Sequence, residues 1–545
     1  MATDIGAVAR DLLGFDALRP GQAEAVAAVL DGRDTLAVMP TGSGKSAIYQ
    51  IAGALVDGPT VVVSPLIALQ RDQAGAIGER DLGGAAEVNS TLTDARRRNA
   101  LRRIVRHEVE FAFLAPEQLA RPDTMDRLRE ARPSLFVVDE AHCISAWGHD
   151  FRPDYLRLGA VIEALGHPTV IALTATASPP VRAEILQRLG MRGPAVVIRG
   201  FERPNLRLEV ETAADAAGVH DGLVERVAEL PGTGIVYVAT RRQAEGLARE
   251  LGAPGRPALA YHGGMTKKRR DTVHERFLDE APCVVVATIA FGMGVDAPHV
   301  RFVVHAESPE SIDAYYQEVG RAGRDGEPAV AVLFHRLDEF GGRRFFAGTA
   351  AIEPAVLERL AGAVQQALEP LPLALLARLI DLPESRLSVA LSRLQEAGAL
   401  RVGTDGLVSS VDGGPSPADA ARRAVGEHEA YRAAERSRLE MMRRLAESPE
   451  CRWKLVLSYF GQPAGPRCGR CDNCDRTAEE GGPGRAEPVA AATYASGTRV
   501  RHRRWGEGAV MGQDGDDVTV LFDDGSYRVL SVAAVVQRDL LTRVA

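Results

Sequence analysis

The stretch Met39-Pro40-Thr41-Gly42-Ser43-Gly44-Lys45-Ser46 decides how the first part of the chain folds. An apolar run at 35–39 precedes the glycines and predicts a buried strand, and residues 46–55 predict a helix. A strand, a glycine-rich turn and a helix in this order are the context of a phosphate-binding loop. The two glycines let the backbone bend around an anion, and the helix start adds positive partial charge.

This loop predicts a nucleotide site with a magnesium ion. We expect Lys45 to bind the terminal phosphates and the Ser46 hydroxyl to bind Mg²⁺. The usual pattern begins with Gly where this chain has Met39, and a glycine turn with a surface lysine is the alternative interpretation. The predicted loop residues are Thr41, Gly42, Ser43, Gly44, Lys45 and Ser46.

Composition restricts the class of protein. The chain has 545 residues, which predicts roughly three to five domains, and a formal net charge of −8, which argues against a surface coated by nucleic acid. Local basic grooves remain compatible with that charge, because binding depends on local phosphate contacts. There is no charged start followed by an apolar core and no apolar run of about 18 residues. We therefore expect a cytoplasmic protein with no membrane partner.

Further apolar runs at 60–63, 111–114, 135–138 and 171–173 predict more strands, which indicates an α/β fold. Ligands in open α/β sheets bind at the carboxyl ends of the strands. Asp139 and Glu140 follow the run at 135–138 directly. We expect Asp139 to hold Mg²⁺ through water and Glu140 to orient or deprotonate an attacking water. A solvated loop is the alternative.

Two other stretches suit nucleotide and nucleic-acid contact. Upstream of the loop, Gln22 has the donor and acceptor that match an adenine edge, with Phe15 to stack and Arg19 nearby; a helix start is the alternative. Residues 145–155 contain three aromatic side chains among Arg and His, which suits stacking on unpaired bases. A packed loop explains them equally well.

A second α/β series follows a crossing segment at 201–206, with predicted strands at 234–238, 258–261, 283–287 and 302–305. Arg321 and Arg324 lie three residues apart, so we expect them to share a helix face. Two guanidinium groups facing a phosphate loop would stabilise the charge that develops in phosphoryl transfer. A solvated basic turn is the alternative.

Four of the six cysteines cluster near the C-terminus: Cys451, Cys468, Cys471 and Cys474. Their spacing suits tetrahedral structural Zn²⁺ with no open position for catalysis, and independent thiols are the alternative. The other two, Cys143 and Cys283, are predicted to be small core residues.

Together these segments resemble superfamily 2 helicases, and the RecQ family in particular, over about residues 12–340. The resemblance implies two tandem RecA-like domains with ATP in the cleft, translocation on single-stranded DNA, and 3′ to 5′ unwinding of duplex or branched DNA in repair or recombination. It also implies a nucleoid-associated protein and the following roles. Phe15, Arg19, Gln22 and Asp296 would bind nucleotide, Arg324 would be the arginine finger beside Arg321, and the residues that couple DNA binding to hydrolysis would be His142, Ser145, Trp147, His149, Phe151 and Arg152.

The resemblance extends to a zinc module to which a helical hairpin leads. The first helix of that hairpin would be a charged helix at about 418–446. The chain departs from the usual RecQ order before this module. Predicted helices at 354–368, 372–380 and 384–397, then two short strands around 404–406, suggest an inserted winged helix. Leu387, Leu391 and Leu394 give the third helix a core face. A purely structural helical insert is the alternative.

Residues 475–497 are rich in Gly, Pro, Ala and Glu and predict a flexible linker. The remainder predicts four or five short strands in a small β-barrel, which resembles the Tudor-like C-terminal domain of UvrD and PcrA helicases. That resemblance implies contact with a protein partner such as RNA polymerase. A basic patch of Arg499, Arg501, Arg503 and Arg504 suits nucleic acid, and a solvated barrel edge explains it almost as well.

The predicted organisation has six parts. They are RecA-like domain 1 at 1–205, RecA-like domain 2 at 206–345, the winged helix at 346–412, the zinc module at 413–478, the linker at 479–496 and the barrel at 497–545. Two other functions stay open at this point: an ATP-driven translocase that remodels or anneals, and an RNA-polymerase-linked DNA-binding adaptor.

Overall fold

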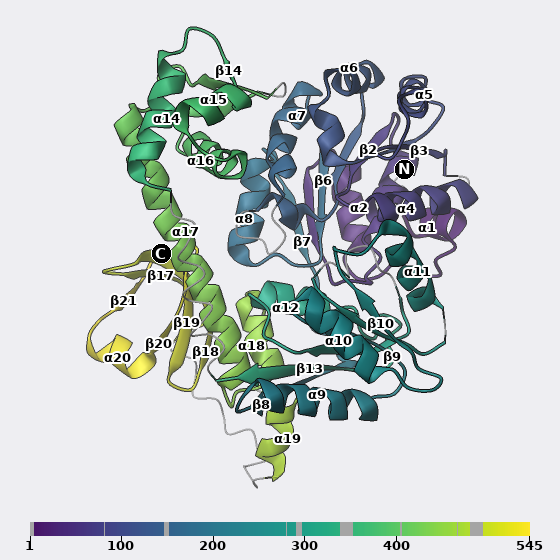
Figure 1. Cartoon of the computed structure of the whole chain (residues 1–545), viewed down its shortest axis with the longest axis vertical. Coiled ribbons are helices and arrows are strands. Elements are labelled where there is room, and N and C mark those ends of the chain that lie inside the picture. The colour runs from purple at the N-terminus through teal and green to yellow at the C-terminus, as the bar shows by residue number, and fades with distance from the viewer. Residues whose placement is uncertain are drawn as a thin grey trace.

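The computed structural model describes residues 5–80, 82–145, 152–279, 281–289, 291, 297–337, 352–403, 406–465, 467–479 and 494–544. Two parallel sheets with flanking helices form one side of the molecule, and a long helix connects them to the remaining parts (Figure 1). Among the helices that the structure describes, none is long and apolar enough to cross a membrane.

The first sheet has seven parallel strands in the order β3-β4-β2-β5-β6-β1-β7. Its central strands are buried throughout, because helices cover both faces. The five strands predicted from apolar runs are present, whereas β3 and β7 at the two edges were not predicted. The strands are β1 (Thr35–Val38), β2 (Thr60–Val63), β3 (Ala85–Val88), β4 (Phe111–Leu114), β5 (Leu135–Val138), β6 (Thr169–Thr174) and β7 (Ala195–Ile198).

Eight α-helices accompany this sheet in the described residues. The helix predicted after the glycine-rich loop is α3, with the predicted bounds. The helices are α1 (Ile5–Leu13), α2 (Gln22–Leu30), α3 (Ser46–Leu55), α4 (Ile67–Glu79), α5 (Asp94–Val105), α6 (Pro122–Ala131), α7 (Leu158–Ala164) and α8 (Pro179–Arg188).

The second sheet has six parallel strands in the order β10-β11-β9-β12-β13-β8. The four predicted strands are β9 to β12, and the unpredicted β8 and β13 pair with each other along eight residues. The elements are β8 (Leu206–Ala213), α9 (Ala216–Glu229), β9 (Thr233–Tyr237), α10 (Arg241–Leu251), β10 (Ala258–Tyr261), α11 (Lys267–Leu278), β11 (Val284–Ala287), β12 (Val300–His305), α12 (Ile312–Val319) and β13 (Ala329–Arg336).

The insert has three helices and a three-stranded antiparallel sheet in the order β14-β16-β15. The three helices and the two strands after them agree with the prediction, whereas β14 was not predicted, and the winged helix stays a hypothesis. Leu387, Leu391 and Leu394 are buried in its separate core, as predicted. The elements are α14 (Pro354–Gln366), β14 (Leu371–Pro372), α15 (Leu373–Ile380), α16 (Glu384–Glu396), β15 (Leu400–Val402) and β16 (Leu407–Ser410).

Helix α17 (Pro417–Glu447) has 31 residues and is therefore about 46 Å long. It runs from the insert to the second sheet, where α18 (Arg452–Tyr459) and α19 (Asp472–Glu479) complete the cysteine-bearing module (Figure 1). The prediction of a flexible linker from residue 475 is wrong for its first five residues. These continue α19, whose first turn carries Asp472 and Asp475 near the positive end of the helix.

The C-terminal part is a five-stranded antiparallel sheet in the order β20-β19-β18-β17-β21, consistent with the predicted small barrel. Its predicted basic patch is largely ion-paired: Arg499 bonds Asp523 and Glu507, and Arg501 bonds Glu507. The elements are β17 (Arg499–His502), β18 (Gly506–Asp514), β19 (Asp517–Phe522), β20 (Tyr527–Ser531), α20 (Val532–Gln537) and β21 (Leu541–Arg543).

Candidate functional site

The glycine-rich loop lies between β1 and α3, at the carboxyl edge of the first sheet. Gly42 and Gly44 have φ angles of 78° and 73°, which glycine adopts without strain. The Lys45 ammonium donates to the carbonyl oxygens of Met39 at 3.1 Å and Pro40 at 3.3 Å. Within the described residues, the buried Ser43 hydroxyl has no hydrogen-bond partner. A loop with a lysine and an unsatisfied hydroxyl at a helix start fits a bound phosphate.

The residues predicted to contact adenine also bind this loop. The buried Gln22 donates from Nε2 to the carbonyl oxygens of Ser43 at 3.0 Å and Gly44 at 2.8 Å. Its Oε1 accepts from the Arg19 backbone at 2.8 Å, and the Arg19 guanidinium donates to the Gly42 carbonyl. Phe15 packs half-buried against the neighbouring core. These bonds fix the loop's shape, and adenine contact by the same residues stays a prediction.

Asp139 and Glu140 follow β5 and lie at the same sheet edge as Lys45. The Ser64 hydroxyl, at the end of β2, donates to Asp139 Oδ2 at 3.2 Å. Burial and the adjacent charge of Glu140 raise the pKa of Asp139 to about 7, whereas the charge of Lys45 opposes this rise. A half-buried carboxylate paired with a nearby hydroxyl fits a magnesium ion bound through water.

Glu140 occupies the left-handed region, with φ at 47° and ψ at 48°. A residue other than glycine pays about 1–3 kcal/mol for such a backbone, and this strain is typical of functional sites. The conformation turns the chain sharply after the strand. Next to it, the buried His142 places Nδ1 3.0 Å from Thr174 Oγ1 and 3.4 Å from Glu140 Oε2.

Three of the six predicted coupling residues are described: His142, Ser145 and Arg152. Ser145 donates to Glu184 on α8, and Arg152 Nη1 donates to the Pro65 carbonyl at 3.2 Å, just after β2. Trp147, His149 and Phe151 lie outside the described residues, as does Asp296. The described three connect the segment after β5 to the ends of β2 and β6 and to α8.

The turn after α12 brings the second sheet to the phosphate loop. The prediction that Arg321 and Arg324 share a helix face is wrong, because α12 ends at Val319 and both arginines lie in the turn that follows. A methyl group added at Gly42 would lie 3.5–3.8 Å from three carbons of the Arg324 side chain. Likewise, a methyl group at Gly320 would lie 3.7 Å from Thr41 Oγ1. The arginine turn therefore packs directly against the phosphate loop.

The two arginines are placed differently. Arg324 lies at the phosphate loop, whereas Arg321 is buried beside the phenol of Tyr237. Burial raises the pKa of Tyr237 to about 12, and the nearby charge of Arg321 opposes that rise. Arg324 is thus the better placed of the two for a phosphate held by the loop.

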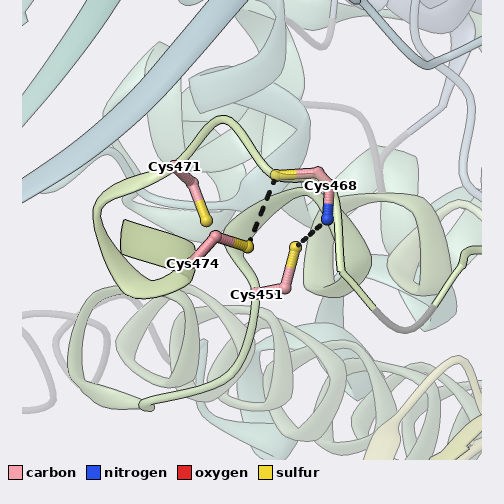
Figure 2. Close-up of side chains that lie close together, drawn as sticks. All are labelled: Cys451, Cys468, Cys471 and Cys474. Atoms are coloured by element: carbon pink, nitrogen blue, oxygen red, sulfur yellow. Dashed lines mark hydrogen bonds between the residues drawn. The ribbon is translucent and has the colours of Figure 1, made fainter. Parts of the chain in front are cut away.

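The four predicted metal ligands come together in space, as Figure 2 shows. Their sulfur atoms all lie within 4.8 Å of one another, and those of Cys468 and Cys474 are 3.9 Å apart. Zinc–sulfur bonds of about 2.3 Å in a tetrahedron place sulfurs roughly 3.8 Å apart. Backbone N–H groups of Cys468 and Arg470 donate to Cys451 Sγ at 3.3 Å and Cys468 Sγ at 3.4 Å, which favours thiolates. The cluster fits structural Zn²⁺.

Sequence reasoning missed the residues that hold the arginine turn. Arg203 donates to three carbonyl oxygens of that turn and Asn205 donates to two in and beside it. Both lie in the segment recognised only as a crossing between domains. The sequence shows both as polar side chains within a short connection. It does not show to which distant carbonyl groups they donate.

Three family models match the chain. They are DEAD/DEAH box helicase over residues 19–184, Helicase conserved C-terminal domain over 222–326 and RecQ zinc-binding over 417–475. The last match covers α17 and the four cysteines, so the chain combines a RecQ-type zinc-binding segment with the two helicase segments. Over these three segments the chain is similar to RecQ helicases.

Curated relatives agree with this similarity to RecQ helicases. The probable ATP-dependent DNA helicase RecS of Bacillus subtilis is 42% identical over 60% of this chain and 66% of its own length. The ATP-dependent DNA helicase RecQ of Pasteurella multocida is 39% identical over 60% of this chain and 52% of its own. The chain thus spans less than two thirds of the length of these relatives.

Solved structures with lower identity show the fold of this chain. The DEAD-box helicase Mss116 bound to ssRNA and UDP-BeF has a TM-score of 0.53 and 17% identity, over 85% of this chain and 89% of that one. The DUF1998 helicase MrfA bound to DNA has a TM-score of 0.52 and 19% identity, over 76% and 60%. Both support the tandem RecA-like arrangement.

Proposed function

We propose that this chain is an ATP- and Mg²⁺-dependent DNA helicase of the RecQ type. It would translocate 3′ to 5′ on single-stranded DNA and unwind duplex or branched DNA in repair or recombination, in the cytoplasm at the nucleoid. The single observation that carries the proposal is the packing of the Arg324 side chain against Gly42, which joins the two RecA-like domains at the phosphate loop. Groups from both domains can therefore act on one nucleotide.

Each site residue has a proposed role in ATP turnover. Lys45 neutralises the terminal phosphates, Asp139 and Ser46 hold Mg²⁺, and Glu140 orients the attacking water. Arg324 stabilises the charge that develops on the transferred phosphoryl group, with Arg321 behind it. The hydrogen bonds of Lys45 and Asp139 support these roles, because they hold both side chains at the carboxyl edge of the first sheet.

Turnover would move DNA through changes in domain contact. ATP closes the two domains and hydrolysis reopens them, so that grips on a strand alternate. Ser145 and Arg152 connect the proposed DNA-contacting segment to α8 and to the end of β2. We expect Trp147→Ala to bind nucleotide normally and to lose most stimulation of ATPase by DNA. Equal stimulation in variant and parent would contradict this coupling role.

The test of the function is unwinding of duplexes with a 3′ or a 5′ single-stranded tail. The parent should separate only the 3′-tailed duplex and require both ATP and Mg²⁺. Lys45→Ala and Glu140→Gln should retain zinc and lose DNA-stimulated ATPase and unwinding. ATP turnover retained in both variants, or preference for the 5′ tail, would contradict the proposal.

A second function, a translocase that remodels protein–DNA complexes or anneals strands, is favoured by the surface of the insert. Helices α15 and α16 expose Leu375, Leu379 and Val389, which suit contact with protein better than contact with phosphate. Deleting residues 350–412 separates the possibilities. Unchanged DNA affinity and unwinding would argue against a DNA-binding winged helix, and lost unwinding with retained translocation would favour remodelling.

We also propose a protein partner, such as RNA polymerase, for the C-terminal barrel. Its arginines at positions 499 and 501 are already paired with carboxylates, which leaves less charge for nucleic acid. Binding of purified polymerase to the parent, and not to a chain lacking residues 497–545, tests this contact. Equal binding by both chains would contradict it.

A further inference from the structure

The connection at 201–206 between the two sheets touches the turn that carries Arg321 and Arg324. Arg203 in this connection is buried, with an exposed fraction of 9%. It donates to the carbonyl oxygens of Gly320 at 3.3 Å, Ala322 at 2.9 Å and Gly323 at 2.7 Å. One guanidinium group therefore donates to three carbonyl groups of the same turn, which its planar arrangement of several N–H donors allows.

Asn205 holds the same turn from a second direction. Its amide donates to the carbonyl oxygens of Gly323 at 2.7 Å and Glu327 at 2.8 Å. The Asn205 carbonyl in turn accepts from the Ala329 backbone at 2.9 Å, at the start of β13. Hydrogen bonds of both the side chain and the main chain of Asn205 thus join the connection to the turn and to the start of β13.

The turn needs such partners because a helix end leaves carbonyl groups without intrahelical donors. Helix α12 ends at Val319 and the chain reverses, with Gly323 in the left-handed region at φ 61°. Arg203 brings a positive charge to this carboxyl end, where the helix dipole favours a cation. The position of Arg324 against Gly42 depends on this turn holding its shape.

We propose that Arg203 is a positioning residue for ATP hydrolysis, which acts by fixing the turn so that Arg324 reaches the phosphate loop. It would act through the turn, whose carbonyl groups it binds. The inference deepens the proposed function and depends on it. Loss of Arg203 should therefore lower turnover while the nucleotide contacts made by Lys45 and Gln22 in the first domain remain.

The zinc module holds the opposite side of the same connection. The Phe201 ring stacks on the Phe460 ring, with ring centroids 4.2 Å apart and an angle of 4° between the ring planes. The backbone N–H of Phe201 donates to Gln462 Oε1 at 3.0 Å. Arg470, between two of the cysteines, bonds Glu202 at 2.5 Å. The connection therefore has contacts with the zinc module and with the arginine turn. These contacts restrict the position from which Arg203 binds the turn.

The test compares Arg203→Met and Arg203→Lys with the parent, and uses Arg256→Met as the matched control. Arg256 likewise donates to carbonyl oxygens at a helix carboxyl end, those of Val227 and Leu230 in α9 and just after it, away from the arginine turn. The measurements are kcat and KM for ATP at saturating single-stranded DNA, the Kd of a fluorescent ATP analogue and the zinc content.

Arg203→Met should lower kcat about 10- to 100-fold, because small misplacement of a catalytic group has effects of this size. Its KM and Kd should stay within about threefold, and Arg203→Lys should recover part of the loss, since lysine restores a charged donor. Arg256→Met should keep kcat within about twofold of the parent, because a helix end remote from the site affects stability instead. In the Arg324→Ala background, measured in single turnovers, Arg203→Met should lower the rate by less than about twofold, because coupled residues are non-additive.

Two results would overturn the inference: a kcat for Arg203→Met within twofold of the parent, or an equal loss with and without Arg324. If Arg203→Met does not give zinc-loaded protein, Arg203→Lys decides by the same two criteria. A parent chain without ATPase activity would overturn the proposed function itself, and the positioning role with it. An active parent with additive losses would overturn the positioning role alone.

Discussion

At the scale of single residues, Gly42 is required for the shape of the phosphate loop. Its φ of 78° is costly for any side chain. A methyl group added there would make ordinary contact with three carbons of the Arg324 side chain, at 3.5–3.8 Å, so the contact between the domains can remain. A substitution at this position therefore tests the backbone of the loop.

Gly42→Ala should lower DNA-stimulated kcat by about tenfold, since a left-handed alanine costs roughly 1–2 kcal/mol. The measurement is steady-state ATP hydrolysis at saturating DNA. Gly246→Ala in α10 is the control, because nothing lies within 4 Å of its added methyl group. Unchanged turnover in Gly42→Ala would contradict a role of this loop conformation in hydrolysis.

Glu110 gives a residue-scale prediction about pH. Burial raises its pKa from 4.5 to about 7, and the nearby charge of Asp57 adds to this, although Thr60 donates a hydrogen bond to it. Below pH 4.5 the carboxyl is protonated in both states. Between pH 4.5 and 7 the native state keeps a proton that the unfolded state has lost, so stability falls as pH rises.

Glu110→Gln removes this titration and keeps an acceptor for Thr60. Its Tm should exceed that of the parent by ~2 °C at pH 8, and the difference should shrink as the pH falls towards 5. Thermal unfolding of the two proteins across this range is the measurement. A difference that stays constant with pH would contradict the raised pKa.

At the scale of elements, the zinc module stabilises the connection between the two sheets. Trp453 on α18 is buried and donates to the Leu206 carbonyl at 3.0 Å, and Phe460 stacks on Phe201. The described residues between α18 and α19 form no helix or strand element, so a metal bound by the four cysteines would order this segment. Losing it should therefore affect the helicase domains and not the module alone.

Cys474→Ser should lower bound zinc from one per chain to substoichiometric amounts and reduce DNA-stimulated ATPase more than about fivefold, since removing one ligand opens a closed tetrahedral site. Zinc release measured by a colorimetric chelator and ATP turnover check this. Cys283→Ala, at a buried cysteine outside the cluster, should keep its zinc. Full zinc in Cys474→Ser, or full activity without zinc, would be inconsistent with the account.

Sequence patterns predicted the elements wherever the chain repeats a strong local signal. The apolar runs that end in polar residues gave nine of the thirteen strands of the two sheets, and the helices of the insert were placed within two residues of their ends. Strand β3 was missed because it is a four-residue edge strand with half-buried Ala85 and Glu87. By contrast, β13 begins with a continuous apolar run of six residues, 329–334, so its signal was present and was overlooked.

The site was predicted in part for the same reason. The loop at 41–46 and the pair Asp139-Glu140 are local motifs whose chemistry depends on adjacent residues. The bonds of Arg203 join residues 117 to 120 positions apart in the chain, and only the fold reveals such partners. The helix-face interpretation of Arg321 and Arg324 failed because spacing alone does not show that α12 stops at Val319.

At the scale of the whole molecule, the added parts gather at the junction of the two domains. The C-terminal barrel stacks Tyr527 on Tyr459 of α18 with ring centroids 4.7 Å apart, and the Tyr459 hydroxyl bonds Asp313 on α12. Arg188 on α8 bonds Glu396 of the insert at 3.3 Å. Each added part therefore contacts an element next to the nucleotide site, and the central event remains the meeting of both domains at the phosphate loop.

The most direct test of that event is Arg324→Ala, with ATP binding and ATP turnover measured on the same preparation. The account predicts an analogue Kd within about threefold of the parent, because the loop and Lys45 remain, and a DNA-stimulated kcat lower by about 1000-fold, as expected for an arginine supplied to a phosphoryl-transfer site. A kcat within twofold of the parent would contradict the claim that one nucleotide is hydrolysed by groups from both domains.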